Sequence, residues 1–171
     1  APFSVDLAPV EPSCFGVNNG QVSTVVNGGV APFSYLWGGA ENTNIITNLS
    51  GGNYYITVTD DNLCTASNSI VLNEPSAISA SVSGTDETCY GSLDGTAYVS
   101  ANGGFLPHSY YWSNGATTAL ISYLAAGIYD VTVSDINGCN VTTSITINSP
   151  SDNIFSQTLT ICDGQSVNVG S

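Results

Sequence analysis

The stretch LSGGNYYITVTDDNLC, residues 49–64, returns as LAAGIYDVTVSDINGC, residues 124–139. Around it the two copies stay in register, without a gap, at an offset of 75 residues. A repeat of this length is too long for one rung of a solenoid and is typical of a small independent domain. The sequence therefore predicts one module over residues 1–75, a second over 76–150, and the opening of a different, truncated module over 151–171.

Each copy is a series of short segments with strand-like alternation, separated by Gly and Asn turns. In the second copy these segments are 77–83, 96–101, 109–112, 119–122, 128–134 and 141–147. The first copy repeats them from Val22 to Leu72, after a segment at Phe3–Leu7. No window holds a helical period of useful length. The pattern predicts an all-β fold of tandem immunoglobulin-like antiparallel sandwiches that form an extended rod.

Two pairs of aromatic residues support this fold class. Tyr54 and Tyr129 follow the pattern Leu-x-x-Gly-x-Tyr, which indicates a tyrosine corner whose hydroxyl bonds back to the chain. Trp37 and Trp112 stand in a strand where immunoglobulin-like sandwiches place a core tryptophan. We therefore interpret all four side chains as structural, and we prefer core packing to a ligand platform for them.

The charge of the chain excludes several classes of partner. The sequence has no Lys or Arg and has thirteen Asp and Glu, for a net charge of −13. Without cations it cannot neutralise nucleic-acid phosphates or bind an anionic membrane surface. No apolar run is long enough for direct insertion into a bilayer. Because 42% of the residues are hydrophobic, the charge belongs to folded domains and not to a disordered acidic tail.

Four of the five cysteines occupy matching positions in the two copies, and none shows the CxxC spacing of a metal site. One pair per repeat indicates an oxidising, extracellular setting. This recurrence favours the disulfides Cys14–Cys64 and Cys89–Cys139 and leaves Cys162 to a partner further along. The immunoglobulin topology argues against these bonds, since it puts the two cysteines of each pair at opposite ends of the sandwich. Both possibilities remain open at this point.

Candidate catalytic and metal-binding residues are few. His108 is the only histidine, and Phe33 takes its place in the first copy, so a general base is not expected and we predict no enzyme. Asp60 and Asp135 begin matching turns, where an Asp side chain accepts hydrogen bonds from backbone amides two residues on. They are also weak calcium candidates, because an acidic extracellular chain can gather oxygen ligands. Apart from calcium, no cofactor is expected.

The shared motifs resemble the SprB repeat family. They are C-[FY]-G-x-x-[ND]-G, then N-G-G-x-x-P-x-S-Y-x-W, then L-x-x-G-x-Y-x-[IV]-T-V-x-D-x-N-x-C, with a closing proline at Pro75 and Pro150. The resemblance covers about five-sixths of the chain; Gly39-Ala40 and Leu63 depart from it only in turns. It implies very large surface proteins of gliding Bacteroidota, exported by the type IX secretion system and attached outside the outer membrane.

We therefore expect a structural and adhesive segment of a cell-surface adhesin with a role in attachment and gliding motility. Its partners would be neighbouring modules of the same chain and an external surface or polysaccharide. Two alternatives remain open. One is a spacer array in a secreted hydrolase. The other is a carbohydrate-binding module that uses aromatic side chains without a tyrosine counterpart in the other copy, namely Tyr55, Tyr90, Tyr111 and Tyr123.

Overall fold

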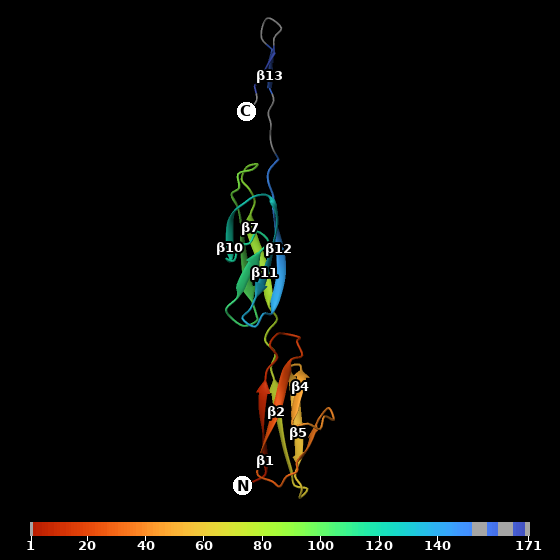
Figure 1. The fold of residues 1–171 in the computed structure, drawn as a ribbon. Coiled ribbons are helices and arrows are strands. Elements are labelled where there is room, and N and C mark those ends of the chain that lie inside the picture. Colours follow the sequence, from red (N-terminus) through yellow and green to blue (C-terminus); the bar gives the residue numbers. More distant parts are fainter. Residues whose placement is uncertain (1, 152–156, 161–165, 170–171) are drawn as a thin grey trace. The chain divides into compact units, whose positions relative to one another are not determined.

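The first copy of the repeat forms six strands, which the computed structural model arranges in two antiparallel sheets (Figure 1). The structure describes residues 2–151, 157–160 and 166–169. One sheet has the order β1-β2-β4 and the other β3-β5-β6. The strands are β1 (Ser4–Val10), β2 (Gly20–Asn27), β3 (Ser34–Trp37), β4 (Ile45–Leu49), β5 (Gly52–Thr59) and β6 (Thr65–Leu72).

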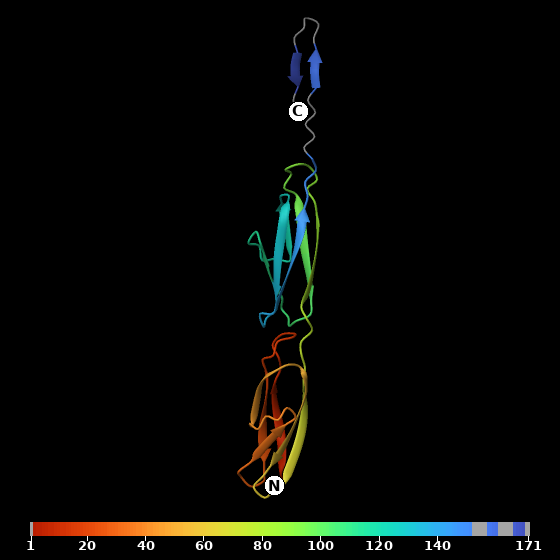
Figure 2. The ribbon, with the colours of Figure 1, turned by 90° about the vertical axis from the view of Figure 1, so that its right-hand side faces the viewer.

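The second copy repeats this topology with sheets of the order β7-β8-β10 and β9-β11-β12 (Figure 2). Its strands are β7 (Ser79–Thr85), β8 (Gly95–Asn102), β9 (Ser109–Trp112), β10 (Leu120–Leu124), β11 (Gly127–Ser134) and β12 (Asn140–Ile147). The predicted all-β, immunoglobulin-like fold class is confirmed. The first strand of this copy begins at Ser79 instead of residue 77. Just before it, the Ser76 carbonyl accepts a hydrogen bond from the Gly104 N–H at 2.9 Å.

Strand register explains which side chains form the core. Val58 lies opposite Tyr35 of β3 on one side and Ala66 of β6 on the other. Alternate residues of β5 therefore point to the same face, and Ile56 and Val58 are buried there. The first core consists of Val5, Val22, Trp37, Ile46, Ile56, Val58 and Leu72. The second copy buries Ala97, Val99, Trp112, Ile121, Leu124, Val131, Val133 and Ile147.

Contacts between Cα atoms divide the chain into two compact units. Unit 1 consists of Ala1–Ala80, Ala101–Tyr110 and Thr132–Thr142. Unit 2 consists of Ser81–Ser100, Tyr111–Val131 and Thr143–Ser171. This division cuts through strands of the second copy, so the module boundaries expected from the sequence stay a prediction.

The tail contributes one further strand pair: β13 (Gln157–Thr160) is antiparallel to β14 (Ser166–Val169). The expected opening of a third module stays a prediction, and Cys162 lies outside the described residues. Within the described part of the chain, no helix has both the length and the hydropathy to cross a membrane.

Candidate functional site

A disulfide inside unit 1 joins the two copies of the repeat, since it links Cys14 to Cys139. Cys14 lies in the loop between β1 and β2, and Cys139 ends the turn between β11 and β12. Their Cα atoms are 5.7 Å apart, inside the range that a disulfide tolerates. The bond connects residues 125 positions apart in the sequence, one from each copy.

The expected pairs Cys14–Cys64 and Cys89–Cys139 are therefore wrong. The reason is the strand topology. Cys14 precedes β2, whereas Cys64 follows a turn whose Asp61 N–H donates at 2.9 Å to the carbonyl of Val30, in the loop after the far end of β2. The eight residues of β2 separate the two ends by about 25 Å. Within the described residues, Cys64 and Cys89 are free and exposed.

The loop that presents Cys14 is closed by side chains on both sides of the cysteine. The backbone N–H of Ser13 donates to Oδ1 of Asn19 at 2.9 Å, and Nδ2 of Asn19 donates back to the Ser13 hydroxyl at 2.7 Å. Glu74 accepts from the N–H of Gly16 at 3.3 Å and from the N–H of Gly51 at 3.0 Å. These bonds fix the loop backbone without any residue from β1 or β2.

The turn that presents Cys139 is organised by the buried carboxylate of Asp135. Oδ1 accepts the backbone N–H groups of Cys139 and Asn137, both at 2.9 Å, and Oδ2 accepts the N–H of Phe105 at 3.0 Å. The Phe105 N–H is the main cause that holds the pKa of Asp135 below its usual value. The N–H groups of Cys139 and Asn137 act in the same direction, while partial burial opposes them.

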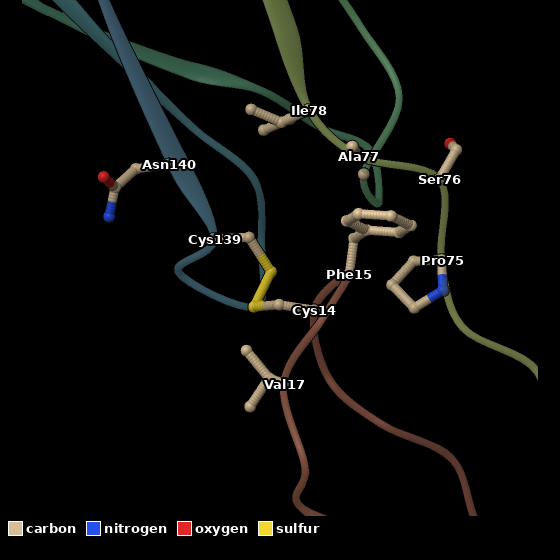
Figure 3. A pocket seen from close by; sticks show the side chains of 10 residues that line it. Cys14, Phe15, Val17, Pro75, Ser76, Ala77, Ile78, Cys139 and Asn140 are labelled. Atoms are coloured by element: carbon tan, nitrogen blue, oxygen red, sulfur yellow. A yellow bond between two sulfur atoms is a disulfide. The ribbon is translucent and has the colours of Figure 1, made fainter. Parts of the chain in front are cut away.

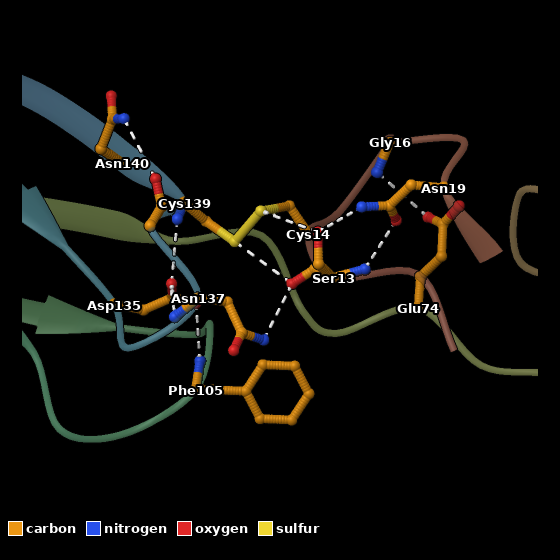
Figure 4. Close-up of a disulfide and its surroundings, with 11 residues drawn as sticks. Ser13, Cys14, Gly16, Asn19, Glu74, Phe105, Asp135, Asn137, Cys139 and Asn140 are labelled. Atoms are coloured by element: carbon orange, nitrogen blue, oxygen red, sulfur yellow. Dashed lines mark hydrogen bonds between the residues drawn. A yellow bond between two sulfur atoms is a disulfide. The ribbon is translucent and has the colours of Figure 1, made fainter. Parts of the chain in front are cut away.

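The disulfide is accompanied by a polar contact between the same two segments (Figure 4). Nδ2 of Asn137 donates to the carbonyl oxygen of Ser13 at 3.1 Å. Sγ of Cys139 lies 3.3 Å from that oxygen. An oxidised sulfur carries no proton, so this second approach is a contact and not a hydrogen bond. The carbonyl of Ser13 therefore lies against both the amide and the sulfur of the turn.

An open pocket of about 300 Å³ lies beside the disulfide in unit 1. Figure 3 shows Phe15 and Pro75 close to one another along one side of it. It is lined by Cys14, Phe15, Val17, Pro75, Ser76, Ala77, Ile78, Gly104, Cys139 and Asn140. None of these side chains is a general base or carries a charge, so the pocket offers apolar contact and no acid–base chemistry.

Both calcium candidates bind backbone amides. Asp60 accepts the N–H of Cys64 at 2.8 Å and the N–H of Val30 at 3.1 Å, and Asp135 does the same in its own turn. The two carboxylates are only 5% exposed. Among the described residues, no group of three or more His, Cys, Asp or Glu side chains is arranged to hold a metal ion. The structure thus gives both residues a role in closing hairpin turns.

The remaining predicted structural residues lie in or next to the cores. Trp37 and Trp112 are buried, and their indole N–H groups each donate at 2.9 Å, to the carbonyls of Thr43 and Thr118. The hydroxyl of Tyr54 donates to the carbonyl four residues earlier, that of Ser50, at 3.0 Å. The Tyr129 hydroxyl does the same to Ala125 at 3.1 Å. These are the bonds of a tyrosine corner.

The other candidates are separated from one another. Nε2 of His108 lies 2.8 Å from the Gly103 carbonyl, which makes it the donor in a local backbone bond. The four tyrosines considered for sugar binding are each at least 60% exposed: Tyr55, Tyr90, Tyr111 and Tyr123. Exposure leaves their rings available, and Tyr55 lines a pocket together with Glu41 and Asn53.

Sequence reasoning missed Ser13 and Asn137 as partners across the disulfide. The sequence did carry a signal for Asn137, because Asn62 occupies the same place in the first copy. Ser13 gave no signal, because it contributes its backbone carbonyl and Thr88 replaces it in the second copy. A backbone acceptor depends on loop conformation and leaves no trace in residue identity.

One known structure supports the fold. Three N-terminal domains of the highly immunogenic outer capsid protein of bacteriophage RB49 align with 85% of this chain at a TM-score of 0.56 and 17% identity. The chain spans 59% of the length of that structure. Murine CEACAM1b (16% identity, 85% of this chain, all of that one) and amphioxus IgVJ-C2 (16%, 84% and 96%) both give a TM-score of 0.34, too low to support an argument.

The family comparison concerns one segment in each copy. No curated protein sequence matches this chain. The family model of the SprB repeat, however, matches residues 7–42 and residues 81–117. The two matches start and end at nearly equivalent positions of the internal repeat. Each covers the cysteine loop and the tryptophan strand of its copy, and thus two of the three motifs that carry the resemblance. The chain therefore contains two segments that match the SprB repeat family.

Proposed function

We propose that this chain is a structural and adhesive repeat segment of a large surface adhesin. The observation that supports the proposal is the pair of SprB-repeat matches at equivalent positions of two immunoglobulin-like sandwiches. Repeats of this family occur in surface proteins, which supports a surface-exposed position for the chain. Attachment, gliding and export by the type IX secretion system are what this resemblance adds to the proposal.

Three chemical properties of the chain suit an extracellular site. The Cys14–Cys139 disulfide persists in oxidising compartments and is rare in reducing ones. The absence of Lys and Arg removes every cleavage site for trypsin-like proteases. The net charge of −13 keeps neighbouring chains soluble and mutually repulsive. A segment of this kind can remain intact and dispersed outside the cell.

The proposed work of the segment is mechanical: it spaces and presents whatever lies beyond it. The hydrogen bonds of the tyrosine corners and the buried tryptophans hold the sandwiches together, and the disulfide joins the first copy covalently to the second. The partners in this proposal are neighbouring modules of the same chain and an external surface or polysaccharide. An extended rod of modules belongs to the same proposal.

Surface labelling of intact cells tests this function. Antibodies raised against the folded chain should label unpermeabilised cells of the source organism, and cells that lack the gene should lose both labelling and attachment to glass. If the antibodies detect the protein only in the culture medium and attachment is unchanged, the result would instead favour a spacer in a secreted hydrolase. Antibody-coated beads that travel along the cell would support the gliding role, and beads that bind but stay fixed would contradict it.

A further inference from the structure

Cys64 and Cys89 are the repeat counterparts of the two bonded cysteines. Cys64 stands in the first copy where Cys139 stands in the second, and Cys89 corresponds to Cys14. We call Cys14 and Cys89 loop cysteines and Cys64 and Cys139 turn cysteines. The bonded pair consists of the loop cysteine of the first copy and the turn cysteine of the second. The two cysteines that are free in the described part of the chain are therefore one loop cysteine and one turn cysteine, both exposed.

From this correspondence we infer that Cys64 and Cys89 each form the same disulfide with a further copy of the repeat. Cys89 bonds to the turn cysteine of another copy, and Cys64 bonds to the loop cysteine of another copy. A second copy of this chain supplies both kinds of partner, so Cys89 of one copy pairs with Cys64 of another. The inference depends on the equivalence of the repeats and not on the proposed adhesive function.

The turn of Cys64 already has the geometry of the bonded turn. The N–H of Cys64 donates to Oδ1 of Asp60 at 2.8 Å, and the N–H of Cys139 donates to Oδ1 of Asp135 at 2.9 Å. In each turn the Asp N–H also donates to the cysteine carbonyl at 2.9 Å. The backbone at Cys64 thus makes the same hydrogen bonds as the backbone at Cys139, although Cys64 has no disulfide partner in the described part of the chain.

The loop of Cys89 likewise matches the loop of Cys14. The Cys14 carbonyl accepts the N–H of Val17 at 3.2 Å, and the Cys89 carbonyl accepts the N–H of Ser92 at 3.1 Å. The glycine two residues after each cysteine has the same backbone angle, a φ of 71°. Positive φ at this place in both loops turns the chain in the same way.

The second loop also has the side-chain hydrogen bond that closes the first loop, with an aspartate in place of the asparagine. In the first loop the Ser13 N–H donates to Asn19 at 2.9 Å, and in the second the Thr88 N–H donates to Asp94 at 3.0 Å. Hydroxyl groups of Thr88 and Ser92 also donate to Asp94, and these bonds lower its pKa to about 2, the Ser92 bond most. The carboxylate therefore keeps this loop closed at neutral pH, and the backbone acceptor of Ser13 has an equivalent in Thr88.

Formation of the new bond is a two-electron oxidation by a small-molecule disulfide. The Cys89 thiolate attacks one sulfur of R–S–S–R, releases R–S⁻, and becomes a mixed disulfide. The Cys64 thiolate then attacks the Cys89 sulfur and releases the second R–S⁻. Two protein thiols become one Cys64–Cys89 disulfide, R–S–S–R is reduced to two R–SH, and the thiol protons pass to the released thiolates.

The consequence is a series of overlapping covalent loops. The loop of the observed bond runs from Cys14 to Cys139, and a bond from Cys89 begins inside that loop and ends in the next copy. Each bond therefore closes over the start of the next one. In a chain of many copies, every junction between repeats would lie inside at least one closed loop, and tension would pass through sulfur–sulfur bonds.

The test uses two variants of the whole chain, each with a single free thiol besides the observed bond. Both carry Cys162→Ser; one also carries Cys64→Ser, and the other Cys89→Ser, with tags of different mass. Each is incubated alone and in an equal mixture with oxidised and reduced glutathione at about 0.15 M salt, which screens the acidic repulsion. Non-reducing gels and peptide mapping then measure the dimers and verify that Cys14–Cys139 is intact.

We expect the mixture to yield the mixed dimer at least tenfold over either homodimer. Random pairing of equal thiols gives a ratio of about two, so any ratio clearly above two supports the inference. A ratio of two or less would overturn it, and so would the absence of dimer in all three reactions. Matched melting temperatures of the two variants show that both are folded.

A substitution away from sulfur separates recognition from chance collision. Asn137 donates to the carbonyl of Ser13 in the observed contact, and Asn62 is its counterpart in the free turn. Asn62→Ala should slow formation of the mixed dimer several-fold. Asn53→Ala changes an exposed asparagine of β5 outside the turn and should leave the rate unchanged. Equal rates for the two variants would show that the turn does not recognise the loop.

Discussion

Oδ1 of Asp135 accepts the backbone N–H of Cys139 at 2.9 Å, and the sulfur of Cys139 is bonded to Cys14. The carboxylate that closes the hairpin turn therefore also fixes the cysteine that links the two copies. Asp60 holds Cys64 in the same way at 2.8 Å. Substitution of the aspartate should therefore affect both the stability of the turn and the position of the cysteine.

Asp135→Asn should lower the stability of the chain at neutral pH. An asparagine side chain has one acceptor oxygen, so one of the N–H groups of Phe105, Asn137 and Cys139 would face an NH2 group. The expected result is a lower melting temperature at pH 7 than in the parent. Asp61→Asn is the control, because Asp61 is exposed and Ile136 takes its place in the second copy.

The same variant should lose its effect in acid. In the folded state the hydrogen bond from the Phe105 N–H, with those from Cys139 and Asn137, holds the pKa of Asp135 below its usual value. A lowered pKa stabilises the folded state above the unfolded pKa, and this contribution disappears as the pH falls through the folded pKa. Melting curves of parent and variant should therefore converge below about pH 4. A difference that stays constant from pH 7 to pH 2 would contradict the role of the charged carboxylate.

The tyrosine corners should make equal contributions in the two copies. Tyr54→Phe and Tyr129→Phe each remove one hydroxyl that donates to a backbone carbonyl, at 3.0 and 3.1 Å. Each should lower the free energy of unfolding by about 1 kcal/mol, the usual net value of such a bond. Tyr123→Phe removes a hydroxyl from a side chain that is 86% exposed and serves as the control. Urea unfolding that shows the same loss for all three would count against the corners.

Stability should increase as salt is added from a low starting concentration. The net charge is −13 and no Lys or Arg compensates it, so the acidic side chains of the folded chain repel one another. This repulsion reaches about as far as the Debye screening length. That length falls from about 30 Å at 0.01 M to about 8 Å at 0.15 M. The melting temperature should rise over this interval by a few degrees, and a neutral solute at the same osmolality should not reproduce the rise. A constant or falling melting temperature would show that other interactions dominate.

The sequence predicts the strands and turns of this protein better than it predicts contacts between residues far apart in the chain. Strand Ser109–Trp112 agrees to the residue, because the aromatic alternation and the flanking turns are local signals. The role of Asp60 as a turn residue was likewise readable from its position in the repeat. The partner of Cys14 was not, because recurrence within a repeat indicates equivalent roles and not mutual contact. Only strand topology shows that Cys14 and Cys64 lie at opposite ends of β2.

The Cys14–Cys139 bond should shorten the chain that can be pulled out under force. With handles at the two termini, tension passes from Cys14 through the disulfide to Cys139, and the chain between them, a sequence separation of 125, is bypassed. At about 3.6 Å per extended residue, that loop hides roughly 450 Å of contour length. Reductant, or the double variant Cys14→Ser and Cys139→Ser, should release this length in single-molecule force spectroscopy. The double variant Cys64→Ser and Cys89→Ser should keep the short length, since it leaves the bond in place. Equal contour lengths with and without reductant would mean that the Cys14–Cys139 disulfide is not formed in solution, and the bond could then transmit no tension between the two copies.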